Sequence, residues 1–179
     1  ADRRTMLPED EVVPCLLRSR SGFPRLEGTG IPVLSEEGKQ LSYDERKAWN
    51  EFWLVDPLDG TKEFVKRNGE FTVNIALIRR GEPILGVVYI PVLDVLYYAE
   101  KGKNAFKENG NENPVQIFSE RADKTKPLSM IESRTHSSQE LEDFLRKEKL
   151  NIIGRVKSGS SSYNGMGCCS WRLHLQEFS

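Results

Sequence analysis

The sequence lacks any long hydrophobic run, and it contains only three cysteines among 179 residues. No apolar stretch approaches the roughly 20 residues of a membrane-spanning helix, and the first residues carry no apolar signal-peptide core. The cysteines, Cys15, Cys168 and Cys169, are odd in number, and an adjacent pair is a poor candidate for a disulfide or a zinc site. We therefore expect no membrane span and a cytoplasmic location.

An excess of charge is missing as well, because 26 Lys and Arg residues almost balance 27 Asp and Glu residues. Non-specific binding to nucleic acid needs a clear surplus of positive charge. We therefore expect no nucleic-acid partner, and a site for an anionic substrate has to be a local feature. With 37% hydrophobic and 30% charged residues, the composition is typical of a soluble globular protein of one or two domains.

The middle of the chain has the clearest pattern of secondary structure. Residues 71–78 are β-branched and aromatic, which predicts a strand, and residues 79–83 are typical of a turn. A second apolar run over 84–90 ends at Pro91, and a third covers 95–99. Short connections of this kind favour an antiparallel meander.

The chain becomes polar and turn-rich over residues 109–126. Residues 130–131 look like the start of a strand, and residues 137–140 offer a helix cap. Apolar spacing from there to Leu150 suits an amphipathic helix. A strand followed by a helix predicts a second unit, of α/β type, that begins near residue 129.

Two aspartates mark the candidate site. Asp56 and Asp59 flank Pro57, where the apolar residues 53–55 run into Asp-Gly. Proline fixes its own φ and Gly60 relieves crowding, so the loop can turn two carboxylates and the carbonyl of Leu58 toward one point. Hard oxygen ligands that converge in this way suit Mg²⁺.

Neighbouring residues extend this candidate site. Glu36 and Glu37 end a short apolar run and can bring a third carboxylate, and the Thr61 hydroxyl can hydrogen-bond a water bound to the metal. Such chemistry would be hydrolysis of a phosphate ester. An EF-hand loop is excluded, because Leu58 stands where its third-position ligand is needed and Gly60 occupies the fifth position instead of the sixth. A solvated Asp-Gly turn stays open as the simpler interpretation.

The extended sequence around this loop resembles a known group of enzymes. Residues 56–61 are similar to the Asp-Pro-(Ile/Leu)-Asp-Gly-(Ser/Thr) signature of the inositol monophosphatase-like superfamily. The flanking residues 52–55 and 62–74 resemble its 3'(2'),5'-bisphosphate nucleotidase (CysQ-like) branch. The likeness includes residues 31–37, and it continues to about residue 106 and more loosely to residue 161.

This resemblance implies a fold and a division of the chain. The fold is α/β, a layered sugar-phosphatase-like architecture. An N-terminal α+β part with an antiparallel sheet covers residues 1–128 and carries the metal site. The start of an α/β part on the substrate side covers residues 129–179.

The resemblance also implies roles for individual residues. Magnesium would be held by oxygen atoms, and the attacking water would be activated by two side chains near it. Asp2 also has a simpler interpretation, as a helix cap. The implied metal ligands are Glu36, Asp56, the Leu58 carbonyl and Asp59, and the residues implied for the water are Thr61 and Asp2.

Two further segments resemble substrate-binding parts of the family. The Ser-Arg-Thr-His segment is Ser133, Arg134, Thr135 and His136, and the arginine offers a guanidinium suited to phosphate. The Gly-Ser-Ser segment contributes Ser160 and Ser161, and Gly60 is assigned to the substrate as well. From the residues alone, a solvated surface pair and a flexible linker remain the alternatives for these two segments. Lys62 and Glu63 stand in the signature, but an exposed pair is the simpler alternative for them, and they are not included among the catalytic residues.

The implied reaction is Mg²⁺-dependent removal of the 3'-phosphate from 3'-phosphoadenosine 5'-phosphate, giving AMP and phosphate. Water attacks in line without a phosphoenzyme, and lithium inhibits by competing at a magnesium position. The substrate is therefore a small nucleotide bisphosphate. The alternatives are an enzyme acting on inositol phosphates or fructose 1,6-bisphosphate, and a catalytically impaired remnant.

The resemblance ends after residue 161. The family continues there with a Leu-Lys-Phe-Cys-type helix and later supplies a Trp-Asp motif whose aspartate is a further metal ligand, whereas residues 162–179 differ. Residues 6–27 do not resemble the family either. We therefore expect a partial chain with weakened metal affinity, since the remaining carboxylates would repel one another. The sequence does not indicate an oligomeric state.

Overall fold

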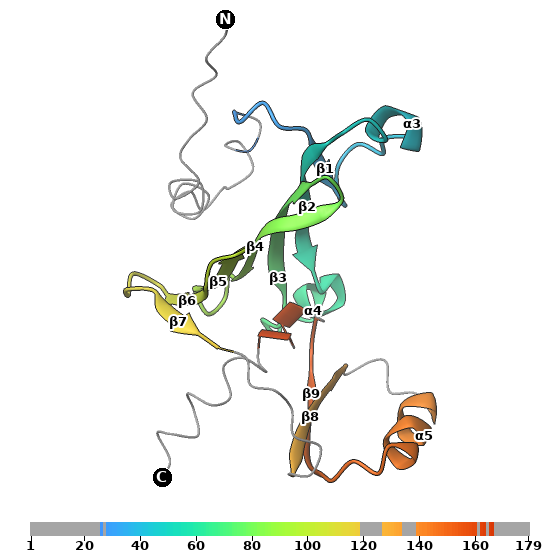
Figure 1. Cartoon of the computed structure of the whole chain (residues 1–179). Helices are drawn as coiled ribbons and strands as arrows, with labels where there is room; N and C mark the ends of the chain where they lie inside the picture. Colours follow the sequence, from blue (N-terminus) through green and yellow to red (C-terminus); the bar gives the residue numbers. More distant parts are fainter. Residues whose placement is uncertain are drawn as a thin grey trace, which may run out of the picture.

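The structure is a computed structural model, and it describes Leu26 and residues 28–118, 127–133, 139–160, 162–163 and 165–166. Its main element is a seven-stranded sheet whose strands follow one another in sequence order (Figure 1). The first two strands are parallel, and all later neighbours are antiparallel. The strands are β1 Val33–Ser35, β2 Glu51–Asp59, β3 Thr72–Arg79, β4 Glu82–Ile90, β5 Val95–Glu100, β6 Ala105–Asn109 and β7 Val115–Ile117.

The predicted antiparallel meander is confirmed from β3 to β6. Arg80 and Gly81 join β3 to β4 with φ angles of 53° and 79°. Two such residues form the type of tight turn whose twist matches the flanking strands. The third predicted strand corresponds to β5, and Pro91 directly follows the end of β4, as its lack of an amide hydrogen predicts.

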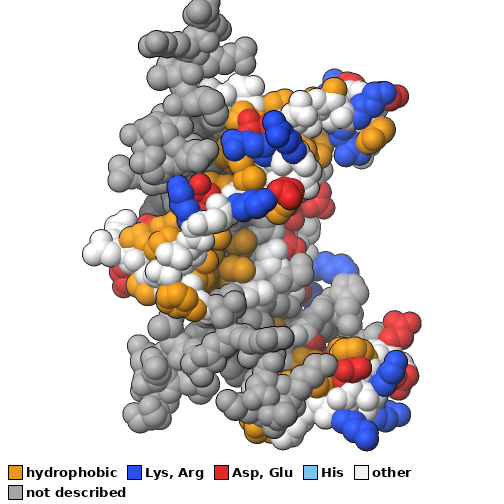
Figure 2. Space-filling view, viewed as in Figure 1, with side chains coloured by type: hydrophobic (Ala, Val, Ile, Leu, Met, Phe, Trp, Pro, Cys, Tyr) orange, Lys and Arg blue, Asp and Glu red, His pale blue; other side chains and the backbone are white. Residues whose placement is uncertain are grey.

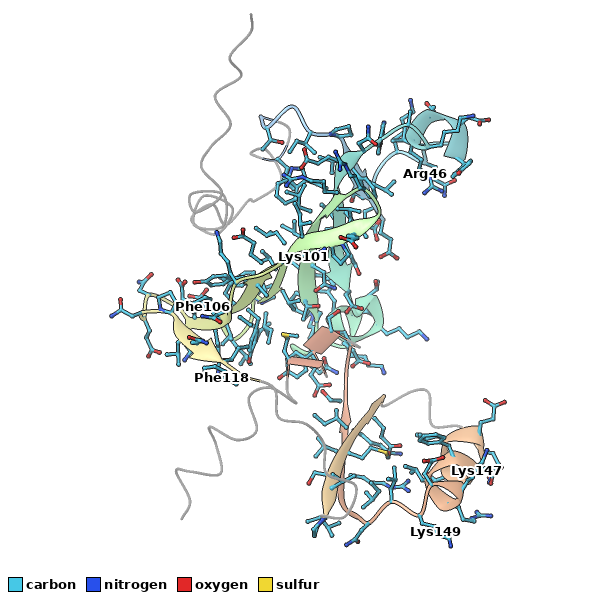
Figure 3. The ribbon with its side chains drawn as sticks, viewed as in Figure 1. Arg46, Lys101, Phe106, Phe118, Lys147 and Lys149 are labelled. Carbon is cyan, nitrogen blue, oxygen red and sulfur yellow. The ribbon has the colours of Figure 1, made fainter. Side chains whose placement is uncertain are left out.

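The polar, turn-rich residues 109–126 also contain a short strand, β7. Residues Ala105 to Lys107 of β6 pair with Ile117 to Val115 of β7. The strand is three residues long, and its hydrogen bonds depend on β6 rather than on a strong local pattern. Hydrophobic side chains gather at this end of the sheet (Figure 2), where Phe106 stacks on Tyr98 with ring centroids 5.5 Å apart. Phe118, just beyond β7, is 73% exposed (Figure 3).

The hydrophobic core lies under the centre of the sheet. Trp53 and Val55 are 1% and 2% exposed, whereas Leu54 between them is 44% exposed, so β2 buries alternate side chains. Trp53 lies opposite Leu77, and the same register continues to Leu85 of β4. This packing fixes the strand whose far end carries the two aspartates.

A second, two-stranded sheet follows. Strands β8 Leu128–Ser133 and β9 Ile152–Ser158 are parallel, and helix α5 Gln139–Lys147 connects them. The predicted strand and amphipathic helix are therefore confirmed, although the helix ends before Leu150. Its predicted cap residues 137–138 lie outside the described residues. The division of the chain at residue 128 stays a prediction.

Two short helices lie next to the main sheet. Helix α3 Tyr43–Arg46 has Ser42 as its N-cap, and Ser42 forms a capping box with Glu45. Helix α4 Thr61–Val65 follows β2 directly (Figure 1), so the predicted turn opens a helix. Within the described part of the chain, no helix is long and apolar enough to cross a membrane.

Candidate functional site

The site begins at an irregularity in the pairing of β2 with β3. Asp56 lies opposite Asn74 and Asp59 opposite Thr72, so three steps along β2 match two along β3. In a regular strand, side chains three positions apart project to opposite faces. The extra residue of this bulge reverses that alternation, and both aspartates project to the same face as Thr72 and Asn74.

Local contacts set the shape of the loop after the bulge. The amide of Leu58 donates to Oδ1 of Asp56 at 3.0 Å, and the Thr61 hydroxyl donates to the Leu58 carbonyl at 3.4 Å. Gly60 has a φ of +96°, and a Cβ there would lie 3.0 Å from Cβ of Ser160. Only glycine adopts this conformation in so little space. Thr61 is exposed, so its hydroxyl is accessible.

Parallel pairing brings Glu36 beside Asp56. The Glu36 amide donates to the Val55 carbonyl at 3.0 Å, one step beyond the end of β1. The Asp56 carboxylate raises the pKa of Glu36, and smaller contributions come from burial, a hydrogen bond with Asp56, and the charges of Glu37 and Asp59. Two carboxylates this close favour a cation between them, because positive charge removes their repulsion.

The donor set tests whether a metal fits here. Glu36 and Asp56 supply only oxygen ligands, which match Mg²⁺. Among the described residues, however, no three His, Cys, Asp or Glu side chains form a group ready to hold a metal. The other predicted carboxylate ligand, Asp59, accepts hydrogen bonds from other groups instead. The residues therefore fit a metal site of two facing carboxylates, with Asp59 nearby.

The Asp59 carboxylate accepts hydrogen bonds from three groups. Its Oδ2 receives hydrogen bonds from Thr72 Oγ1 at 3.4 Å, Asn74 Nδ2 at 3.4 Å and the amide of Ser162 at 3.2 Å. Asn74 Nδ2 also donates to Ser162 Oγ at 2.9 Å. Thr72 is fully buried. Asp59 therefore links the main sheet to the segment that follows β9.

The two segments predicted to bind substrate start at the carboxyl ends of the two strands of the second sheet. Ser133 is the last residue of β8, and it pairs with Ser158, the last residue of β9. The carboxyl ends of parallel strands are a common place for ligand sites, because the loops that follow them meet there. Five predicted site residues lie outside the described residues: Asp2, Arg134, Thr135, His136 and Ser161.

Ser160 is 5% exposed, and its backbone amide and its hydroxyl both have partners. Its amide donates to the Glu70 carbonyl at 3.2 Å, and its hydroxyl accepts from the amide of Tyr163 at 3.1 Å. Burial raises the pKa of Tyr163, and the charge of Glu70 adds a smaller effect. The structure therefore brings Ser160 next to Gly60, while its role toward a substrate stays a prediction.

Sequence reasoning missed the part played by Glu63. The alternative of an exposed pair is wrong for Glu63, since Glu63 is 4% exposed and accepts a hydrogen bond from Asn68 Nδ2. Charged residues at the start of a short helix are usually solvated, so a signal for burial was absent from the local pattern.

Comparison with known proteins identifies the family. The family model described as "Inositol monophosphatase family" matches residues 24–168. The chain belongs to the inositol monophosphatase family. This finding confirms the resemblance seen in the Asp-Pro-Leu-Asp-Gly-Thr motif at residues 56–61.

Individual relatives agree with this assignment. The chain is 54% identical over 117 residues to the 3'(2'),5'-bisphosphate nucleotidase CysQ of Salmonella typhimurium, a match that covers 65% of this chain and 45% of that protein. The crystal structure of CysQ from Bacteroides thetaiotaomicron matches with a TM-score of 0.65 and 40% identity, over 77% of this chain and 56% of that one. The chain thus spans about half the length of the relatives it matches.

A third comparison concerns the fold alone. Inositol monophosphatase-II from Staphylococcus aureus matches with a TM-score of 0.62 at 23% identity, over 89% of this chain and 55% of that one. The expected α/β fold with a mostly antiparallel sheet is therefore confirmed.

Proposed function

We propose that this chain carries the metal-binding part of a magnesium-dependent phosphatase that removes the 3'-phosphate from 3'-phosphoadenosine 5'-phosphate. The observation that carries the proposal is the pair of facing carboxylates, Glu36 and Asp56, where the parallel pairing of β1 with β2 ends. A relative with 54% identity named as a 3'(2'),5'-bisphosphate nucleotidase supports the choice of substrate.

Glu36, Asp56, the Leu58 carbonyl and Asp59 are the residues that would hold Mg²⁺. The ion would supply positive charge for the phosphoryl oxygens and would acidify a water molecule. Asp59 would have to give up part of its bonding with Thr72, Asn74 and Ser162 to contribute a ligand.

The chain's own residues orient the reactants. The Thr61 hydroxyl donates to the Leu58 carbonyl at 3.4 Å, and its oxygen can accept a hydrogen bond from a neighbouring water. The water oxygen attacks phosphorus as the bond to the 3'-oxygen breaks. The attacking water loses one proton and the 3'-oxygen gains one, so the step balances, and the products are AMP and inorganic phosphate. The segment around Ser160 closes the site on the side of Gly60.

A phosphate-release assay tests the proposal. The full chain is mixed with 3'-phosphoadenosine 5'-phosphate or with inositol monophosphate, each with Mg²⁺ and with or without Li⁺. We expect release from the nucleotide that needs Mg²⁺ and falls with Li⁺. Preferential release from inositol monophosphate would instead favour the other branch of the family.

A remnant that binds metal without turnover is the second candidate. It is favoured by the three hydrogen bonds that occupy Asp59, which leave Glu36 and Asp56 as the two carboxylates facing each other. Calorimetric binding of Mg²⁺ without phosphate release from either substrate would support the remnant and contradict the phosphatase. A location in the cytoplasm stays a prediction.

A further inference from the structure

A buried carboxylate lies beside the site without a part in the proposed reaction. Glu63 of α4 is 4% exposed, and its Oε2 accepts a hydrogen bond from Asn68 Nδ2. The backbone amide of Asn68 donates to the backbone carbonyl of Glu63 at 3.3 Å. Lys66 is more distant, with its Nζ 3.9 Å from Oε1 of Glu63, and its side chain is 53% exposed. Because a buried charge is costly without a close donor, Asn68 is the partner that Glu63 depends on.

Asn68 in turn holds the loop that leads into β3. Its Oδ1 accepts a hydrogen bond from the Glu70 amide at 3.1 Å. The residues on either side, Arg67 and Gly69, have φ angles of 57° and 79°. The backbone amides of Arg67 and Asn68 still donate to carbonyls of α4, and the Asn68 side chain extends this connection to Glu70.

The Glu70 backbone then receives the segment after β9. The amide of Ser160 donates to the Glu70 carbonyl, and a Cβ at Gly159 would lie 2.5 Å from the Glu70 Cβ. The same carbonyl lies 3.2 Å from the position of a Cβ at Gly60. Glu70 therefore lies between the aspartate loop, residues 56–61, and residues 159–160, and the amide of Ser162 just beyond them donates to Asp59.

We propose that Asn68, fixed by the buried Glu63, is a positioning residue that sets where the segment 159–163 meets Asp59. Asn68 acts through the Glu70 carbonyl and does not touch the reacting groups. Release of Asn68 would let Glu70 shift, and the segment would lose its docking point near the site. The catalytic consequence rests on the proposed function, whereas the structural consequence does not.

The first experiment is amide hydrogen exchange on the full chain, which needs no activity. Asn68→Ala removes a hydrogen bond to a charged acceptor, so exchange in the peptide covering 159–163 should rise about ten- to a hundredfold. A peptide from β4 serves as the internal control and should stay within about twofold. Lys66→Ala is the matched control variant, and its exchange should equal that of the original chain.

Two further variants keep the test decisive. Glu63→Gln retains an acceptor for Asn68 Nδ2, so we expect slow exchange in 159–163. Asn68→Ala also leaves a buried charge without its donor, and the chain with Glu63→Leu and Asn68→Ala together avoids that penalty. The double variant should fold and should show the same faster exchange in 159–163. Unchanged exchange there, or an equal rise in the β4 peptide, would overturn the positioning role.

The kinetic readout separates this inference from the proposed function. For Asn68→Ala we expect the KM for 3'-phosphoadenosine 5'-phosphate to rise about tenfold while kcat changes less than about threefold. Absence of turnover in the original chain would contradict the proposed function but leave the exchange result to decide on Asn68. An unchanged KM in an active chain would overturn the catalytic consequence.

Discussion

The contact between Gly159 and Glu70 predicts a large effect from a single methyl group. In Gly159→Ala, the new Cβ would lie 2.5 Å from the Glu70 Cβ and 2.6 Å from the Glu70 carbonyl oxygen. Carbon atoms in ordinary contact are about 3.5–4.0 Å apart, so one side has to move by about 1 Å. Glu70 precedes β3 and lies against Gly60, so we expect the segment after β9 to move.

The size of the effect follows from this displacement. A shift of about 1 Å takes the Ser160 amide, now 3.2 Å from the Glu70 carbonyl, out of hydrogen-bonding range. Overpacking of this kind costs about 1–3 kcal/mol of the free energy of unfolding. Gly154→Ala in β9 is the matched control, because its Cβ would meet nothing closer than Ser129 Oγ at 3.6 Å. That change should be neutral or stabilise by about 0.4–1 kcal/mol.

Urea unfolding followed by Trp fluorescence measures both variants. The two ranges place the variants about 1–4 kcal/mol apart, which corresponds to a midpoint difference of at least about 0.3 M. Hydrogen exchange should locate the loss of protection in residues 159–163. Equal midpoints for Gly159→Ala and Gly154→Ala, with residues 159–163 still protected, would refute the close approach to Glu70.

Further predictions concern the aspartate loop and the core below it. Asp59→Asn keeps the shape of the side chain but removes its charge, and we expect no Mg²⁺-dependent phosphate release from the variant; full activity would refute its role as a ligand. Gly60→Ala should lower the free energy of unfolding by about 1–2 kcal/mol, because its φ is +96°; an unchanged urea midpoint would contradict this. Val55→Ala removes part of a side chain that is 2% exposed and should cost about 2 kcal/mol in the same assay; a loss below about 0.5 kcal/mol would mean that this face of β2 is not core. Mg²⁺ at about 100 times its Kd should stabilise the chain by about 2.7 kcal/mol, and Asp56→Asn should abolish that gain in thermal unfolding; an equal gain in both chains would place the ion elsewhere.

The central strands could be predicted because their signals are local. Residues 71–78 combine β-branched and aromatic side chains, and the structure has β3 at this position. Asp56 and Asp59 could be found for the same reason, since the motif is contiguous. The bulge that turns both to one face is a property of the pairing with β3, and the sequence of β2 alone does not specify it.

Other features depend on contacts between distant residues, and local patterns do not encode them. The short strand β7 exists because β6 supplies hydrogen-bonding partners, so the polar residues around it suggested a turn. The burial of Glu63 depends on Asn68 and the following loop, so the sequence around Glu63 leaves an exposed position open. The role of Gly159 was hidden for a similar reason, since only the folded chain brings it against Glu70.

The hydrogen bond between Ser162 and Asp59 joins residues that are 103 positions apart. It also has a consequence for the order of folding. Each hairpin of the main sheet closes a short loop, whereas this bond closes most of the chain and carries a larger entropic cost. We therefore expect the sheet to form first as the chain emerges during synthesis. The site would be completed last, when the strands β8 and β9 have paired and Ser162 reaches Asp59.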